Sequence, residues 1–238
     1  MPIVTLPDGS QRRYDAPLSI MQVAESIGPG LAKACVAGKI NGRLVDAADL
    51  VEDDAEVAII TARDPEGLEI IRHSCAHLIG HAVKQLYPDA KMAIGPVIED
   101  GFYYDFDMDH RLTDADLKKI EKGMKKLMGR KEKFEMTEMS RDEAEKMLAA
   151  DNQGYKIERL ADIPEGEKIT FYTCGNFTDL CRGPHVENAG EIGAVKLMSV
   201  AGAYFKGDEH NPMLQRIYGT AWNDKKDLKE FYHIYQWG

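Results

Sequence analysis

The stretch from His73 to His81, "HSCAHLIGH", places three histidines at steps of four residues, with small or aliphatic residues between most of them. An α-helix has about 3.6 residues per turn, so these imidazoles fall on one helical face. Imidazoles on one face can bind a metal, transfer protons, or form a polar stripe at the edge of a core. The spacing alone leaves these three interpretations open.

A second cluster lies far downstream, where "CRGPH" sets Cys181 and His185 four positions apart. Together with His73 and His77, it offers a thiolate and three imidazoles, a ligand set suited to tetrahedral zinc. The alternative is a pair of hydrogen-bonded histidines at a core edge. A metalloprotease is disfavoured, because no glutamate follows His73 as it does in H-E-x-x-H. We interpret His81 as structural, since nothing downstream pairs with it.

Three further residues are candidates for the same pocket. Asp179 adds a carboxylate two positions before Cys181, although a turn aspartate that binds its own backbone is the alternative. Lys156 in "GYKIE" and Tyr104 in an aromatic segment could join it, but their spacing does not show whether they do. A surface position is the usual alternative for such a lysine.

Composition limits the classes of function. The 238 residues suffice for one large or two ordinary domains, and the formal charge of −10 disfavours bulk attraction to nucleic acid while leaving room for a local basic groove. Four cysteines without a C-x-x-C pair indicate reduced thiols. The N-terminus lacks the features of a signal peptide, and no window has the length and hydropathy of a membrane span. We therefore expect a cytoplasmic protein without a membrane partner.

The first 61 residues indicate a small mixed domain. The segments "PIVTL" and "QRRY" flank the turn "PDGS", which is typical of a hairpin. Ser19 and Gln22 form a capping box ahead of a helix that should stop at Gly28. The segments "ACVAGKING", "RLVD" and "EVAIIT" then predict short strands. One helix on a four- or five-stranded sheet is the β-grasp pattern.

Residues 62–68 resemble a linker, and the rest indicates a larger domain. Apolar residues recur at helical spacing over 68–86, and "MAIGPVIEDGFYYDFD" predicts a hairpin that turns at Asp100 and Gly101. Capping boxes at Thr113 and Ser140 open helices of roughly 113–128 and 140–150. Alternation after residue 168 predicts antiparallel sheet. The predicted class is α+β: a β-grasp domain followed by a larger α+β domain with an antiparallel sheet and a long central helix.

Long stretches of the chain are similar to a known family. The segments "RHSCAHLIGHAVKQLYPDAKMAIGPVIEDGFYYDFD", "DLCRGPHV" and "AGAYFKGDEHNPMLQRIYGTAW" resemble the N-terminal half of a bacterial threonyl-tRNA synthetase. The segments "MPIVTLPDGSQRRYD" and "GPGLAKACVAGKINGRLVD" resemble the β-grasp TGS domain that precedes it there. The resemblance implies a TGS domain at 1–61, a linker at 62–68, a tRNA-editing domain at 69–224, and the start of a linker helix at 225–238.

The editing domain of that family hydrolyses serine wrongly attached to threonine tRNA. Serine lacks one methyl of threonine, and a pocket built for threonine rejects it by only about 1 to 3 kcal/mol, so a second sieve is needed. The resemblance implies that His73 positions water or transfers a proton, that Lys156 activates water or stabilises charge, and that Asp179 holds the seryl ammonium or hydroxyl. It also implies five substrate-binding residues that line and shape the pocket: His77, Gly95, Tyr104, Cys181 and His185.

The same histidine and cysteine pairs are similar to those of alanyl-tRNA editing proteins, where they bind zinc. The threonyl family is taken to edit without an obligatory metal, so we expect no required cofactor. Zinc remains the alternative, with a ligand set taken from both pairs: His73, His77, Cys181 and His185.

Two departures from the family shape the expected function. The family continues into an aminoacylation core and an anticodon-binding domain that this sequence does not contain, and "EFYHIYQWG" departs from the charged helix expected there. We expect an ester hydrolase that acts on the acceptor end of tRNA(Thr) carrying serine and does not make threonyl-tRNA. A homodimer is expected for the full-length family. The alternatives are a non-catalytic RNA- or nucleotide-binding regulatory fragment and a zinc hydrolase for another small ester or amide.

Overall fold

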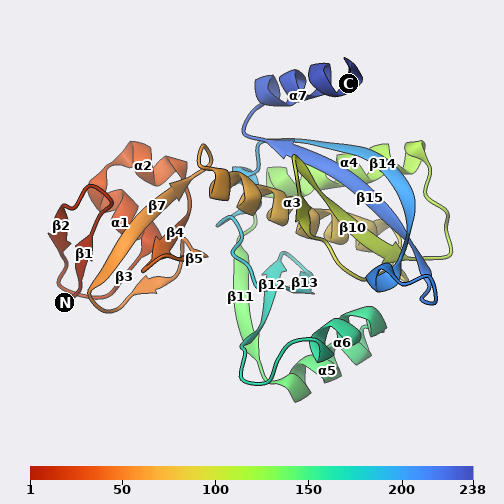
Figure 1. Cartoon of the computed structure of the whole chain (residues 1–238), viewed down its shortest axis with the longest axis horizontal. Coiled ribbons are helices and arrows are strands. Elements are labelled where there is room, and N and C mark those ends of the chain that lie inside the picture. Colours follow the sequence, from red (N-terminus) through yellow and green to blue (C-terminus); the bar gives the residue numbers. More distant parts are fainter. Residues whose placement is uncertain (238) are drawn as a thin grey trace.

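In the computed structural model, residues 1–237 are described. They form two α+β domains joined by one long helix, α3 (Pro65–Leu86) (Figure 1). The predicted fold class is confirmed. Within the described residues, no helix combines the length and the apolar character that crossing a membrane requires.

The N-terminal domain is a five-stranded sheet with two helices, α1 (Ile20–Ile27) and α2 (Pro29–Ala34). The strand order is β2-β1-β7-β4-β5, in which only β1 and β7 pair in parallel. The strands are β1 (Ile3–Thr5), β2 (Gln11–Arg13), β4 (Cys35–Ile40), β5 (Arg43–Asp46) and β7 (Ala55–Thr61), with a short pair, β3 (Leu18–Ser19) and β6 (Leu50–Val51).

The start of α1 agrees with the sequence, because the capping box between Ser19 and Gln22 is present in both directions. Helix α2 was not predicted. Pro29 and Gly30 indicated a break, but proline fits the first turn of a helix, where its missing N–H costs no hydrogen bond. A second short helix therefore follows the first almost at once.

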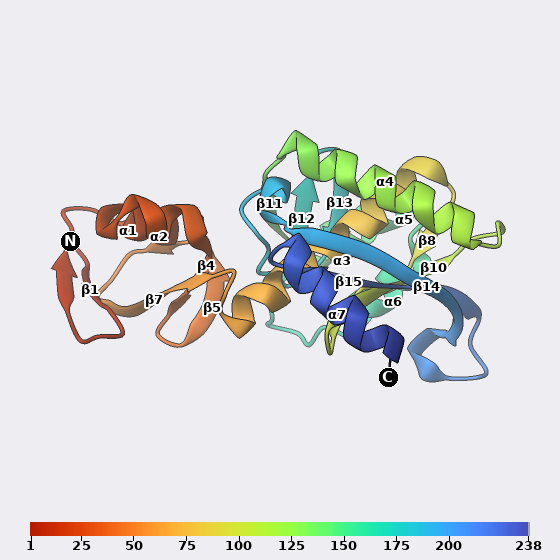
Figure 2. The ribbon, with the colours of Figure 1, turned by 90° about the horizontal axis from the view of Figure 1, so that it is seen from above.

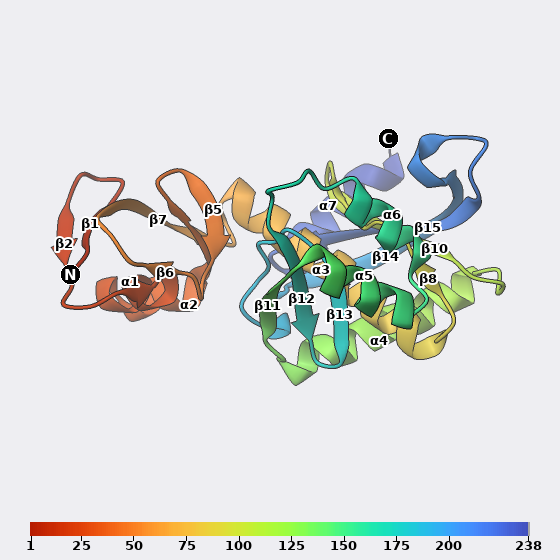
Figure 3. The same cartoon turned by 90° about the horizontal axis from the view of Figure 1, so that it is seen from below.

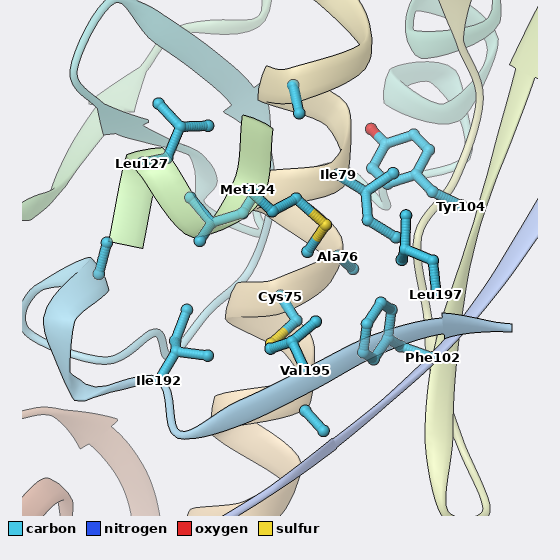
Figure 4. Packing of buried hydrophobic residues seen from close by; sticks show 14 of the residues in the cluster. Cys75, Ala76, Ile79, Phe102, Tyr104, Met124, Leu127, Ile192, Val195 and Leu197 are labelled. Carbon is cyan, nitrogen blue, oxygen red and sulfur yellow. The ribbon is translucent and has the colours of Figure 1, made fainter. Parts of the chain in front are cut away.

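Helix α3 is the central element of the C-terminal domain (Figures 2 and 3). It begins at Pro65, inside the stretch predicted as a linker, and its buried positions run from Gly67 to Val83. Figure 4 shows Cys75, Ala76 and Ile79 of this helix among side chains from a second helix and from the large sheet. Helix α3, which carries the histidines, is therefore held in place by packing against α4 and the large sheet.

The C-terminal domain has two antiparallel sheets. The large one has the order β14-β15-β10-β8, with β9 also on β10, and the small one has the order β11-β12-β13. The strands are β8 (Lys91–Met92), β9 (Val97–Ile98), β10 (Gly101–Asp107), β11 (Phe134–Met139), β12 (Ile169–Cys174), β13 (Phe177–Leu180), β14 (Ala194–Tyr204) and β15 (Met213–Trp222). The hairpin of β9 and β10 has the predicted turn region.

The helices of this domain surround the two sheets. They are α4 (Asp114–Arg130), α5 (Arg141–Ala150), α6 (Gly154–Ala161) and α7 (Lys225–Trp237), with short 3-10 turns η1 (Ala189–Glu191) and η2 (Phe205–Gly207). Both predicted capping boxes, at Thr113 and Ser140, are present. Helix α6 was not predicted, because its N-cap position is Gln153, which makes no side-chain cap.

One apolar core crosses the boundary between the domains. Val36, Ala37 and Ile60 of the N-terminal sheet belong to the same buried cluster as Ile70 and Ile71 of α3. The two domains therefore share a packed interface, and within the predicted linker only Gly67 is buried.

Candidate active site

A cavity of about 300 Å³ lies beside α3, and elements from both sheets of the C-terminal domain reach it. All eight residues that the sequence singled out for a site line this cavity: His73, His77, Gly95, Tyr104, Lys156, Asp179, Cys181 and His185. Segments far apart in the sequence therefore meet at one place.

Each element contributes a specific side chain. Helix α3 supplies His73 and His77 one turn apart, and β10 supplies Tyr104. Helix α6 supplies Lys156, which is buried, and β13 supplies Asp179, which is 8 % exposed. A loop after β13, the 181–185 loop, carries Cys181 and His185.

A thiol and two imidazoles converge on the wall formed by this loop. The Cys181 Sγ lies 3.2 Å from Nε2 of His73 and 3.2 Å from Nε2 of His185, and the two rings stack with centroids 4.4 Å apart. The Nδ1 of His185 lies 3.0 Å from the Ser74 hydroxyl, which donates to the carbonyl of Ile70. The Ser74 hydroxyl proton is already donated to Ile70, so Nδ1 of His185 carries the ring proton and donates it to the Ser74 oxygen. The unprotonated Nε2 of His185 then faces the Cys181 sulfur.

The donor set suits a soft, tetrahedral metal ion. The ligand atoms of His73, Cys181 and His185 lie within 4.8 Å of one another, and they are nitrogen and sulfur, which zinc prefers. Of the four ligands considered from the sequence, His77 is the one that lies outside this close group. The ring of His77 instead packs edge-on against Phe134 and Phe177.

Burial keeps these groups neutral. Desolvation lowers the pKa of His73, against a hydrogen bond to the Pro184 carbonyl that raises it, and desolvation lowers the pKa of His77 to about 4. Desolvation also lowers the pKa of His185 well below its usual value and raises the pKa of Cys181 to about 12. At neutral pH the wall therefore presents free-base imidazoles and a protonated thiol.

The lining of the same cavity also carries a buried ion pair. The Lys156 Nζ lies 2.9 Å from Oδ1 of Asp179, and the Tyr104 hydroxyl donates to Oδ2 at 2.6 Å. Burial alone would raise the pKa of Asp179, but the nearby Lys156 charge, His77 and the tyrosine hydrogen bond together lower it. Burial and the Asp179 charge raise the pKa of Tyr104 well above 10. The trio is thus a cation, a carboxylate and a neutral donor.

Gly95 lets the chain lie directly on the Tyr104 ring. A Cβ at this position would overlap the ring, and the flanking segment is held to β10 by hydrogen bonds from Ala93 N to Asp105 O and from Asp105 N to Ile94 O. Gly95 therefore sets the width of the cavity beside the tyrosine.

Comparisons with known proteins place the chain. The TGS domain model matches residues 2–61, and the model described as "Threonyl and Alanyl tRNA synthetase second additional domain" matches residues 169–218. The Threonine--tRNA ligase of Methylococcus capsulatus (strain ATCC 33009 / NCIMB 11132 / Bath) is 55% identical over 231 residues, which is 97% of this chain and 36% of that protein. The Threonine--tRNA ligase of Hahella chejuensis (strain KCTC 2396) is 53% identical over 233 residues, or 98% of this chain and 37% of that protein.

The chain corresponds to the N-terminal TGS and editing region of the threonyl-tRNA synthetase family. The resemblance seen in the sequence is thereby confirmed. This chain spans little more than a third of the length of these relatives. Within the match to the second additional domain lie three site residues, Asp179, Cys181 and His185.

Three polar or charged residues at this candidate site, Ser74, Arg159 and Arg182, were not expected from the sequence. Ser74 is fully buried and joins α3 to the 181–185 loop through His185 Nδ1 and the Val186 amide. Arg159 and Arg182 line the cavity, and Arg182 is largely exposed, 2.9 Å from a Glu167 carboxylate oxygen. Of these three, only Arg182 could have been suspected from the sequence, because it directly follows Cys181.

Proposed function

We propose that this chain hydrolyses the ester that joins serine to the terminal ribose of mischarged tRNA(Thr), the editing reaction of its family. The observation that carries the proposal is the buried trio of Lys156, Asp179 and Tyr104, which lines the same cavity as His73 in a chain whose relatives are threonine--tRNA ligases. A carboxylate, a cation and a free base are the groups that an aminoacyl ester and its attacking water require.

Asp179 recognises the amino acid. An ionised carboxylate has about four lone-pair sites, and the lysine and the tyrosine occupy one site on each oxygen. The remaining sites accept hydrogen bonds from the α-ammonium or the hydroxyl of serine. The fixed partners hold the carboxylate in one orientation, so substrate binding requires little reorganisation.

Water is the nucleophile in this proposal. The pKa of Cys181 is raised to about 12 by burial, so very little thiolate is present at neutral pH, and a covalent acyl-enzyme is disfavoured. The neutral ring of His73 orients a water molecule and takes its proton as the water oxygen bonds to the carbonyl carbon, because its lowered pKa keeps the free base at neutral pH. The same proton then passes to the ribose oxygen as the bond between that oxygen and the carbonyl carbon breaks. Lys156 stabilises the negative charge that develops on the carbonyl oxygen between these two steps.

No metal is required in this proposal. Should zinc bind, His73, Cys181 and His185 would hold it, and it would supply a Lewis acid and a more acidic bound water. Elemental analysis together with deacylation before and after chelation tests this point. Stoichiometric zinc, with activity lost to a chelator and restored by zinc, would replace the metal-free proposal.

The experiment that tests the function is single-turnover deacylation of seryl-tRNA(Thr), with threonyl-tRNA(Thr) as the competing ester. We expect loss of serine and retention of threonine, and a large loss of rate in His73→Ala, Lys156→Ala and Asp179→Ala. The matched control is Lys168→Ala, whose side chain is 78% exposed. Near-normal rates in all three variants would contradict the roles proposed for His73, Lys156 and Asp179. Binding of tRNA without any deacylation would favour a non-catalytic RNA-binding role.

A further inference from the structure

The TGS domain places one carboxylate against the editing site. Asp46, the last residue of β5, accepts a hydrogen bond from the backbone N–H of His185 at 3.0 Å and another from the Tyr172 hydroxyl at 2.6 Å. The first bond ends on Oδ1 and the second on Oδ2, so both oxygens serve the other domain.

Asp46 is itself held firmly. Its backbone N–H donates to the Asp49 carboxylate at 2.8 Å, and its carbonyl accepts from the Asp49 N–H at 3.0 Å. Asp46 also pairs in the sheet with Ala37, which lies in the apolar cluster that includes α3. The carboxylate therefore projects from a turn that is anchored to the same core as the catalytic helix.

The groups that Asp46 holds are parts of the site. His185 contacts Cys181 through Nε2, and its ring is edge-on to Tyr172 with centroids 4.6 Å apart. Gly183, with a φ of +67°, lies against the Tyr172 ring where a Cβ would collide with the hydroxyl. Tyr172 and Asp46 together support the 181–185 loop from the side of the TGS domain.

We propose that Asp46 is a positioning residue for the editing reaction, so that the TGS domain completes the editing site. This inference rests on the proposed function. Without the carboxylate, the His185 N–H and the Tyr172 hydroxyl lose their acceptor, and the loop shifts to find another one or water. A displacement of about 1 Å at reacting groups costs on the order of 100-fold in rate.

The test uses four variants of the full chain. Asp46→Ala removes the acceptor, and Tyr172→Phe removes only one donor. Asp46→Asn is the conservative variant: its amide oxygen accepts from His185, and its amide NH2 donates to the Tyr172 oxygen. Asp53→Ala is the matched control, an exposed aspartate of the same domain.

Two readouts separate positioning from a general loss of stability. In single-turnover deacylation, Asp46→Ala lowers the rate at saturating protein by about 10- to 100-fold, while the half-saturating concentration stays near that of the unmodified chain. Asp46→Asn keeps most of the rate, and Tyr172→Phe lies between them. Amide hydrogen exchange of His185 gives the second readout: its protection is lost in Asp46→Ala and kept in Asp46→Asn.

The outcomes distinguish this inference from the proposed function. If the unmodified chain fails to deacylate, but protection of His185 still follows Asp46, the proposed function fails, while the support of the 181–185 loop by Asp46 stands. If Asp46→Ala matches Asp53→Ala in both readouts, the inference is wrong. It is also wrong if Asp46→Asn falls as far as Asp46→Ala, since charge would then matter in place of hydrogen bonds. Should Asp46→Ala not fold, Tyr172→Phe and Asp46→Asn carry the same comparison.

Discussion

At the scale of single residues, the candidate site depends on a charge pair that is costly to bury. The side chains of Lys156 and Asp179 are 7% and 10% exposed, so both ions have lost most of their water. Such a pair breaks even only when its remaining hydrogen-bonding capacity is satisfied, and the Tyr104 hydroxyl contributes to this. We infer that the pair is placed for chemistry more than for stability.

The first expected outcome concerns the stability of this pair. Lys156→Met leaves a buried, unpaired carboxylate and should reduce the free energy of unfolding by about 3 to 5 kcal/mol. Adding Asp179→Leu removes that carboxylate and should recover much of the loss, although the proposed function predicts no deacylation by the double variant. Urea unfolding of the two single variants and the double variant measures the coupling. If the losses of unfolding free energy in the two single variants simply add in the double variant, the unpaired charge is not the main cause of the loss.

Sequence reasoning located part of this residue set for physical reasons. Four-residue spacing fixes a shared helical face, so His73 and His77 could be grouped from the sequence alone. Lys156 could be reached only through resemblance, because α6 was not predicted and a lone lysine carries no periodic signal. Nothing in the sequence indicated a role for Asp46, because its partners Tyr172 and His185 lie 126 and 139 residues away along the chain.

At the scale of elements, the segment that contains Gly95 packs directly on the Tyr104 ring of β10. This contact fixes the position of the tyrosine in the cavity. Gly95→Ala places a methyl on the Tyr104 ring and should push the hydroxyl away from Asp179, which lowers single-turnover deacylation by about tenfold or more. Gly129→Ala in α4 is the control, because no atom lies within 4 Å of its added Cβ. The result would count against this geometry if both variants retained equal activity.

The turn η1 should make stability depend on pH. Burial raises the pKa of Glu191 from 4.5 to about 7. Between these values the folded chain holds a proton that the unfolded chain releases, so stability falls as pH rises through this window. Glu191→Gln has no carboxyl group to titrate, so its stability does not fall in this window. Its Oε1 can still accept a hydrogen bond from the Glu187 N–H. Above pH 7 it should be more stable than the unmodified chain by about 1 to 2 kcal/mol, after allowing for solvent screening.

Urea unfolding at pH 5, 6, 7 and 8 checks this expectation. The difference between Glu191→Gln and the unmodified chain should grow with pH across the window and then level off. Glu99→Gln, an exposed side chain, serves as the control and should show no such growth. A constant difference at every pH would show that Glu191 does not titrate differently in the folded chain.

Elements with a local signature were predictable, and elements defined by context were not. Ser19, Thr113 and Ser140 open helices with reciprocal capping boxes, which are local. Pro65 and Gly67 indicated a linker, but they begin α3. Proline suits the first helical turn, and Gly67 is needed because a Cβ there would collide with the Thr61 carbonyl at the end of β7. That reason exists only once the chain turns from β7 into α3.

At the scale of the whole molecule, net charge limits how the chain could bind the tRNA that the proposed function requires. The formal charge is −10, so capture of a polyanion must rely on local cations. Arg182 is 73% exposed at the rim of the cavity, and its partner Glu167 competes with any phosphate for the guanidinium. The single-stranded acceptor end of tRNA is the part that must reach this rim for the ester to enter.

Arg182 and Glu167 should therefore act in opposite directions on tRNA capture. Arg182→Gln should raise the half-saturating protein concentration in seryl-tRNA deacylation and reduce the slope of log affinity against log salt by about 0.7, the value for one single-strand phosphate contact. Glu167→Gln frees the guanidinium and should lower the half-saturating concentration. Titrations from about 50 to 200 mM salt measure both effects. The control is Arg13→Gln, which removes an exposed cation of β2. If its salt slope changes as much as that of Arg182→Gln, Arg182 at the rim of the cavity has no special part in tRNA binding.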